Sequence, residues 1–471
     1  MRSAWGSQRE ACTNGSCAGI VLDGQLGEQL VNMVYVNVQS GSNREPFEPD
    51  LDALRFALDL VVDPPDTNPS ALDELPLAMP ERGIGPQAAL ELVAQIALPQ
   101  SSSLLDPMAA SRMATPTPWL TWAAAVWSAS RSENLLHKAD TPQVNELQDR
   151  VIGWLSPLWG MATGHFVPGG TIANLTALWA ARDGSGATRI VTSEASSVSV
   201  SKVARVLGMP LIFIDSNPDE SMNMDALIDF ARRDPDGMSR TAVVLTAGTQ
   251  NTGAIDPLRD AMKGLSNLGL RPAWWHVDAS WAGPLALSDR RRPLLKGIDS
   301  ADSVTISAHK MMFQPTESAV VLFKDAARSD SVLEFAGPDE TTQVGLLGSR
   351  ADRSLALTLL LLAYGEDGLA AWVDSGIDAM MALAEALRQR PDVDVFNSPV
   401  SGVLLWRSTT HSTDDVLAGL GRKVAGLGIA DGRRWVRQVG SNPLMDVDEL
   451  VVRISGVLDA LNSNQQTSTR Q

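Results

Sequence analysis

The sequence predicts an α/β protein whose central part is a doubly wound, mainly parallel sheet covered by helices on both faces. Two observations predict this class. Short apolar runs rich in β-branched residues alternate with helical segments between residues 189 and 323, which is the pattern of strands buried on both faces. After Gly365 the chain changes to long helices with few strands, which is typical of a smaller α+β domain.

The N-terminal part of the chain is predicted to be helical and to carry little chemistry. Residues 1–50 mix Gly, Ser, Asn and Gln around one apolar patch, so we expect an arm that orders only against a partner surface. From Leu51 onward, apolar residues recur every three to four positions between proline-rich breaks, which predicts packing helices. We assign residues 1–115 to this arm and helical segment.

The central runs define the expected sheet. They begin at residues 189 (RIVT), 210 (PLIFI), 241 (TAVVLT), 273 (AWWHVDA), 303 (SVTISA) and 319 (AVVLF). Helical segments are predicted between them at 194–207, 222–232 and 257–268. We expect a large domain over residues 116–365 and a small C-terminal α+β domain over residues 366–471. In such a sheet ligands bind beyond the carboxyl ends of the strands, so the residues that follow the runs are candidates for a site.

Composition and charge argue against several classes of partner. The net charge of -17 is unfavourable for nucleic acid or an anionic membrane, which both attract clustered Lys and Arg. The two cysteines, Cys12 and Cys17, provide no disulfide framework and no four-ligand zinc set. The most apolar stretch, Leu355 to Ala363, is too short to span a bilayer. We expect a cytoplasmic protein with neither nucleic-acid nor membrane partners.

Asp278 and Lys310 carry the first indication of chemistry, because each follows a predicted strand. A carboxylate at the end of a buried strand is costly unless a cation pairs with it, and a protonated pyridine nitrogen is such a cation. Burial beside a cationic ring would lower the pKa of Lys310, and the neutral amine could then form an imine. Singly, each residue is also compatible with a turn or a structural pair.

Two further segments are rich in small and hydroxyl residues. Residues 168–171 (PGGT) lead into a helical segment, so backbone amides, a hydroxyl and a helix N-terminus converge there, as in a phosphate site. An ordinary helix cap is the alternative. Residues 246–249 (TAGT) end another run, and an ordinary turn between strand and helix is the alternative there.

The order of the segments GGTxxN, TAGTxNTGAIDPL, HVDA and SVTISAHKMMFQP resembles that of the group II pyridoxal-dependent decarboxylases. That family includes enzymes for glutamate, aspartate, diaminobutyrate and aromatic amino acids. The resemblance runs from about Thr115 to Asp367. It implies fold type I, the aspartate aminotransferase-like fold, with pyridoxal 5'-phosphate as cofactor. It also implies a homodimer with its active site at the subunit interface.

The resemblance implies roles for individual residues. Lys310 would be the Schiff-base lysine, and Asp278 would pair with the pyridine nitrogen. The phosphate would be bound at Gly170, Thr171 and Ser307. The ring would be lined by Thr246 and by Ala279 or Ser280, and His309 would lie beside the phosphate or the substrate.

The sequence departs from the family pattern at three places. Ser197 occupies the position of a histidine that stacks on the cofactor ring in relatives, and a serine side chain has no π face to stack. The segment Arg328 to Leu347 contains no tyrosine, although many relatives have one there to protonate the carbanion. Residues 115–118 (TPTP) stand where the family often has His-Pro.

Arg350 is a candidate for the substrate carboxylate, because a guanidinium binds a carboxylate through two parallel hydrogen bonds. A salt bridge with Asp352 at the start of the next helix is the alternative. We expect a decarboxylase of a small L-amino acid that is acidic, diamino or aromatic. The departures leave a decarboxylative oxidase, an aldehyde synthase or other carbon-lyase chemistry as an alternative, and a non-catalytic binding subunit as a third. The substrate pocket is built from dispersed positions, so the sequence does not identify the substrate.

Overall fold

The computed structural model describes residues 49–468 except 66–67, 69, 99–103, 138–139 and 333–342. The expected arm at residues 1–50 therefore lies almost entirely outside the described residues, as does the centre of the predicted tyrosine-free segment. The chain divides into two compact units, residues 1–102 and 103–471.

The first unit contains the helices α2 (Leu51–Val62) and α3 (Pro86–Ala97) and the 3-10 turn η2 (Ala71–Glu74). The Asp50 side chain caps α2 by accepting two backbone N–H groups, and α3 begins with proline at its first position, where a missing N–H does no harm. No residue of α2 is buried, and Ala94 is the buried residue of α3. Several apolar side chains of these helices are therefore exposed, among them Leu54, Leu58 and Val62.

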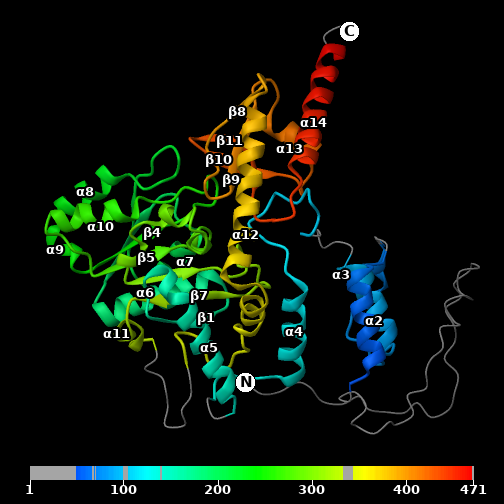
Figure 1. Ribbon diagram of the computed structural model, residues 1–471, viewed down its shortest axis with the longest axis horizontal. Helices are drawn as coiled ribbons and strands as arrows, with labels where there is room; N and C mark the ends of the chain where they lie inside the picture. The colour runs from blue at the N-terminus through cyan, green and yellow to red at the C-terminus, as the bar shows by residue number, and fades with distance from the viewer. Residues whose placement is uncertain are drawn as a thin grey trace, which may run out of the picture. The chain divides into compact units, whose positions relative to one another are not determined.

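The second unit is built around a seven-stranded sheet with the order β1-β7-β6-β5-β4-β2-β3 (Figure 1). The strands are β1 (Thr163–Val167), β2 (Arg189–Ser193), β3 (Leu211–Ile214), β4 (Thr241–Thr246), β5 (Trp274–Asp278), β6 (Ser303–Ile306) and β7 (Ala319–Phe323). Strands β2 to β6 pair in parallel, whereas β7 runs antiparallel to β1 and β6. Every run that the sequence predicts is a strand here, and β1 is the strand that the prediction missed.

Helices cover both faces of this sheet, as the continuous apolar runs predict. On β4, Ala242 and Val244 face one core, which α6 and α7 complete, while Val243 and Leu245 face the other, which α5, α8, α10 and part of α12 complete. The helices are α4 (Trp119–Arg131), α5 (Pro142–Leu155), α6 (Gly169–Ser185), α7 (Val198–Leu207), α8 (Met224–Arg233), α9 (Pro235–Met238), α10 (Leu258–Asn267), α11 (Ala326–Asp330) and α12 (Leu355–Arg388). The helices predicted near 194–207, 222–232 and 257–268 correspond to α7, α8 and α10.

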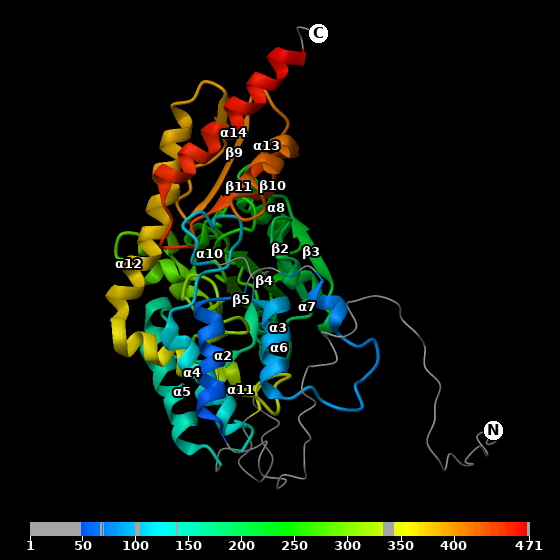
Figure 2. The ribbon, with the colours of Figure 1, turned by 90° about the vertical axis from the view of Figure 1, so that its right-hand side faces the viewer.

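Helix α12 leads from the large sheet into the C-terminal region (Figures 1 and 2). Its backbone breaks at Gly365, whose φ of 67° is accessible to glycine at little cost. By length and composition, α12 resembles a membrane span. However, Leu357 and Leu360 before the break lie in the core of the large sheet, and Met380 and Leu383 after it lie in the C-terminal core. Helix α12 is therefore a core element of both regions.

A smaller antiparallel sheet with the order β10-β11-β9-β8 forms the C-terminal region. Its elements are β8 (Val393–Val395), β9 (Val403–Ser408), α13 (Thr413–Leu420), β10 (Gly426–Ala430), β11 (Arg433–Val439) and α14 (Val447–Ser468). The segment 106–112 runs along this region, where Ala110 N–H donates to the carbonyl of Lys423 and Val439 N–H donates to the carbonyl of Ala110. This segment brings residues from far upstream next to β11.

Candidate active site

A cavity of about 500 Å³ opens at the carboxyl ends of the parallel strands and the N-terminus of α6. Strand pairing aligns these ends, with Thr246 opposite Asp278 and Asp278 opposite Thr305. The predicted site residues that line the cavity are Gly170, Thr171, Ser197, Thr246, Asp278, Ser280, Ser307, His309 and Lys310. Arg350 and Ala279, the alternative to Ser280, are the predicted site residues that are not part of this lining.

Asp278 is the last residue of β5 and is 4% exposed. Its Oδ2 accepts a hydrogen bond from Asn174 Nδ2 at 2.7 Å, and its Oδ1 accepts one from Ser280 N–H at 3.1 Å. Donors on both oxygens stabilise the ionised carboxylate. A negative charge is therefore held at the cavity wall, where it can face a cationic group.

Lys310 lies in the turn after β6, and its N–H donates to the carbonyl of Ser307 at 3.1 Å. Burial lowers the pKa of Lys310, the charge of Asp278 opposes this shift, and the charge of Arg437 adds to it. The neutral form of a lysine is the nucleophile that condenses with a carbonyl compound. The carbonyl of Lys310 accepts a hydrogen bond from the Thr115 hydroxyl at 2.7 Å. Thr115, which stands where the family often has histidine, therefore contacts the turn that contains Lys310.

Gly170 forms a cradle together with two serine hydroxyls. A Cβ atom built at Gly170 would lie 2.7 Å from both Ser280 Oγ and Ser307 Oγ, so a side chain there would displace both hydroxyls. Helix α6 begins at Gly169 and has no side-chain cap, which leaves its first N–H groups open to an anion. The cradle, Lys310 and Asp278 together fit the phosphate, the aldehyde and the ring nitrogen of pyridoxal 5'-phosphate.

Ser197 and His309 supply the remaining polar groups of the predicted set. Ser197 caps α7, where its Oγ accepts hydrogen bonds from both N–H and Oγ–H of Ser199. His309 Nδ1 is 2.8 Å from the carbonyl of Ser318, and burial lowers the pKa of its imidazole. Among the described residues of the lining, His309 is the one with an aromatic ring. Ser197 thus provides a hydroxyl at the position where relatives are expected to have a histidine that stacks on the cofactor ring.

Thr246 ends β4, and its buried Oγ1 has no hydrogen-bond partner within the described residues. Its backbone N–H donates to Asp256 Oδ2 at 2.7 Å, and Met222 N–H donates to Asp256 Oδ1 at 2.7 Å. Burial raises the pKa of Asp256 to about 7, while these two hydrogen bonds oppose the shift. Sequence reasoning missed Asp256, which holds the backbone of Thr246 so that a free hydroxyl lies at the cavity wall.

Arg437 and Arg112 also line the cavity, and the sequence did not identify either of them. Arg437 lies on β11 and is 9% exposed, and its Nε has no partner within the described residues. Burial lowers the pKa of its guanidinium, and the charge of Glu220 opposes this shift. The sequence does show Arg437 as a charged residue within the stretch WVRQV. Strand periodicity alone, however, does not say which surface or cavity that face of the strand contacts.

Arg350 lies elsewhere in the second unit. Its N–H donates to Asn134 Oδ1 at 3.1 Å and its guanidinium to the carbonyl of Gly348 at 3.3 Å. Its charge adds to the effect of burial in lowering the pKa of His165 to about 4. The Asp352 carboxylate accepts hydrogen bonds from the N–H groups of Ser354 and Leu355 at the start of α12. The structure does not bring Arg350 to the cavity, so its assignment to the substrate stays a prediction.

Comparison with known proteins agrees with a cofactor site of this kind. Residues 69–408 match the conserved domain of pyridoxal-dependent decarboxylases. The chain is 29% identical to L-2,4-diaminobutyrate decarboxylase of Rhizobium meliloti, over 81% of this chain and 83% of that protein. It is 31% identical to aspartate 1-decarboxylase of Aliivibrio fischeri, over 54% of this chain and 52% of that protein.

A solved structure shares the fold. The glutamate decarboxylase domain of a diaminobutyrate-pyruvate transaminase and L-2,4-diaminobutyrate decarboxylase from Vibrio parahaemolyticus superimposes with a TM-score of 0.75 at 21% identity. The match covers 89% of this chain and 97% of that chain. The predicted α/β fold of type I is therefore confirmed.

Proposed function

This chain belongs to the family of pyridoxal-dependent decarboxylases, and on that premise we propose that it removes the α-carboxylate of a small acidic L-amino acid. The single observation that carries the substrate class is the buried guanidinium of Arg437 at the wall of the cavity. Oxidative and other carbon-lyase outcomes are less favoured, because the named relatives are decarboxylases of diamino, acidic and aromatic amino acids.

The cofactor of this family is pyridoxal 5'-phosphate, which when bound accepts the electron pair released as carbon dioxide leaves. In this proposal the Asp278 carboxylate holds a proton on the ring nitrogen by charge pairing. The N-terminus of α6 and the hydroxyls of Ser280 and Ser307 bind the phosphate. Lys310 attaches the cofactor and takes part in proton transfer at the α-carbon.

The charges in the cavity favour an acidic substrate over a diamino one. Asp278 is the only acidic residue among the described residues that line the cavity, whereas Arg112 and Arg437 line it as well. Arg437 Nη1 donates to the carbonyl of Ser111 at 3.5 Å, and the charge of Glu220 acts on its guanidinium from outside the cavity lining. A substrate side chain with a carboxylate would pair with a guanidinium there, whereas a second ammonium group would meet repulsion.

A substrate panel tests this proposal. Purified enzyme with cofactor is offered L-aspartate, L-glutamate, L-2,4-diaminobutyrate and L-tryptophan, and both carbon dioxide and the amine are measured, together with oxygen consumption. We expect equal amounts of carbon dioxide and amine, with the highest kcat/KM for an acidic substrate. A higher kcat/KM for diaminobutyrate would contradict the substrate class, and carbon dioxide with an aldehyde and oxygen uptake would contradict the reaction.

Arg437→Leu is expected to lower kcat/KM for the acidic substrate by about 10- to 100-fold, the range for losing a hydrogen-bonded charged group. The cofactor dissociation constant should stay close to the wild-type value. Arg434→Leu is the matched control, because Arg434 lies on the same strand but is exposed and paired with Asp414. An Arg437→Leu enzyme with wild-type kcat/KM would assign the substrate to other residues.

A homodimer with its active site at the subunit interface is part of the proposal, and the helices of the first unit support it. Leu54 and Leu58 of α2 are 48% and 51% exposed, and Val62 is 79% exposed. Apolar stripes of this kind normally pack against another surface. We expect sedimentation analysis to give twice the chain mass, and Leu54→Glu with Leu58→Glu to give a monomer. The control is Val452→Glu on α14, and a monomeric wild type would contradict the proposal.

A cytoplasmic location is also proposed. Support comes from the sequence, in which two cysteines leave no disulfide framework for an oxidising compartment. Fractionation of cells that express the full chain tests the proposal. Recovery of the enzyme outside the soluble cytoplasmic fraction would contradict it.

A further inference from the structure

A buried line of polar side chains ends at Asp278. Its members are Trp274, Ser303, His276, Asn174 and Asp278, none of them more than 4% exposed. The successive contacts are 2.7 Å from Trp274 Nε1 to Ser303 Oγ and 2.8 Å from Ser303 Oγ to His276 Nδ1. The next are 3.0 Å from His276 Nε2 to Asn174 Oδ1 and 2.7 Å from Asn174 Nδ2 to Asp278 Oδ2. Only Asp278 touches the cavity.

The direction of every hydrogen bond in this line follows from its two ends. An ionised carboxylate only accepts, so Asn174 must turn its amide nitrogen to Asp278 and its oxygen to His276. Burial lowers the pKa of His276 to about 4, although the charge of Asp278 and the backbone of Ser303 oppose this shift. The imidazole is therefore neutral, with its proton on Nε2 and a lone pair on Nδ1.

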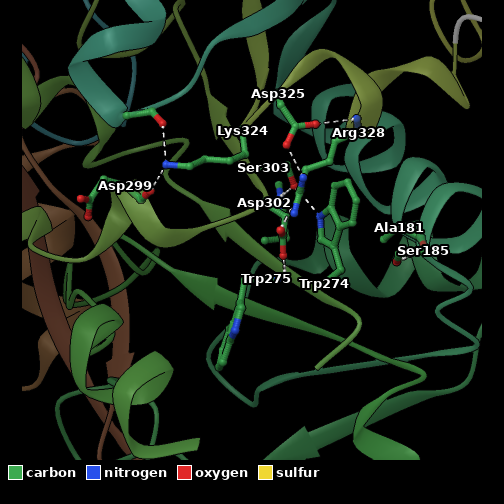
Figure 3. Close-up of polar contacts among 12 residues, drawn as sticks. Ala181, Ser185, Trp274, Trp275, Asp299, Asp302, Ser303, Lys324, Asp325 and Arg328 are labelled. Carbon is green, nitrogen blue, oxygen red and sulfur yellow. Dashed lines mark hydrogen bonds and ion pairs between the residues drawn. The ribbon is translucent and has the colours of Figure 1, made fainter. Parts of the chain in front are cut away.

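The other end agrees with this assignment. An indole N–H only donates, and Figure 3 shows the bond from Trp274 to Ser303. The Ser303 hydroxyl hydrogen is then directed to His276 Nδ1. The ring of Trp274 is itself held in place, because the Arg328 guanidinium lies 6.0 Å from its centre and Arg328 is bound to Asp302. The four members before Asp278 thus all donate in one direction, towards the cavity.

Asn174 also starts a second branch. Its other amide hydrogen is directed to Ser199 Oγ at 3.0 Å, and Ser199 Oγ–H donates to Ser197 Oγ at 2.9 Å. Ser197 Oγ therefore accepts from Ser199, and its own hydrogen is available to the cavity that it lines. One carboxamide thus orients both Asp278 and the residue that replaces the expected stacking histidine.

We propose that Asn174 is a positioning residue, which with His276 behind it holds Asp278 as a correctly oriented carboxylate and so keeps the cofactor ring nitrogen protonated. The inference rests on the proposed cofactor site. Without the Asn174 amide, the buried Asp278 Oδ2 would lose this hydrogen-bond donor. The ionised form of the Asp278 carboxyl group would then be less favoured. The ring nitrogen would then lose part of its counter-charge.

The test uses Asn174→Leu, which preserves volume and removes the donor. The cofactor dissociation constant is measured by absorbance titration of the apo-protein. The protonation of the ring nitrogen is measured from the chemical shift of ¹⁵N-labelled pyridoxal 5'-phosphate without substrate. We expect binding to weaken by about 10- to 100-fold, the loss of a charge-assisted hydrogen bond, and the shift to move towards that of the neutral ring.

A pair of variants at His276 keeps the test independent of how Asn174→Leu folds. His276→Gln retains a donor for Asn174 and an acceptor for Ser303 and should retain the wild-type shift, whereas His276→Phe should move it in the same direction as Asn174→Leu. His165→Phe is the matched control, because His165 Nε2 is buried without a partner within the described residues and lies outside the line.

The outcomes separate this inference from the proposed function. Wild-type protein that takes up no cofactor would overturn both. Cofactor uptake by the wild type, with an unchanged dissociation constant and nitrogen shift in Asn174→Leu and His276→Phe, would overturn the inference alone. A shift in those two variants, with none in His276→Gln and His165→Phe, would support it.

Discussion

Lys310→Ala is expected to lower the rate of carbon dioxide release by about 10³-fold or more, within the range found when a positioned catalytic group is removed. The reason is the environment of the lysine, because burial lowers its pKa and makes the neutral amine available to the cofactor carbonyl. Without that amine the cofactor has no covalent attachment and the α-carbon has no adjacent base. The visible absorbance band of bound cofactor should disappear in the same variant.

The control for this experiment is Lys263→Ala. Lys263 is exposed on α10, so its loss should change neither the band nor the rate. If Lys310→Ala kept the absorbance band and a rate within tenfold of the wild type, the cofactor would be attached elsewhere. The assignment of the cavity would then be wrong.

Asp278→Asn is expected to lower kcat by roughly 10²- to 10³-fold. Removing one partner of a buried charge pair costs about 3–5 kcal/mol, and here the other partner would be the protonated ring nitrogen. The Asn side chain would also place an amide nitrogen or oxygen where Asn174 Nδ2 now donates at 2.7 Å. The expected signature is a large fall in kcat with a smaller change in KM for the amino acid.

Asp374→Asn separates this effect from general destabilisation. Asp374 accepts hydrogen bonds from Ser288 Oγ–H and Arg291 Nε, so it is also a paired carboxylate. It lies on α12, away from the cavity lining. We expect Asp374→Asn to lower the melting temperature and to leave the cofactor spectrum unchanged. Equal loss of kcat in both variants would assign Asp278 a structural role.

The large sheet was predictable because its strands are buried on both faces. Strand β4 is buried at every position, so its sequence is one apolar run that local patterns identify. Strand β1 escaped the prediction because TGHFV contains glycine and histidine and pairs with β7 alone at the sheet edge. In the C-terminal region the apolar run GVLLWR at residue 402 predicts β9. Neither β10, which contains two glycines (GLGIA), nor the more polar β11 (RRWVRQV) was predicted.

The meeting of the predicted cofactor residues at one cavity follows from the same local rule. Thr246, Asp278 and Lys310 each end or follow a strand, and parallel strands end at one edge of the sheet. The arginines that we propose for substrate recognition were not predictable in this way. Arg437 comes from a strand of the small domain and Arg112 from a segment far upstream, and only the packing of that segment beside β11 brings them to the same cavity.

The sequence by itself determined the fold class through strand periodicity, which is a local property, and the order of its motifs indicated the family and its cofactor, with Lys310 as the predicted anchor. Only the tertiary structure decided which residues support Asp278. The line from Trp274 through His276 and Asn174 to Asp278 joins residues from β5, β6 and α6, and Arg350 is placed away from the cavity. Such contacts depend on how distant elements pack and on which face of each element is buried. The spacing of residues along the chain determines neither of these.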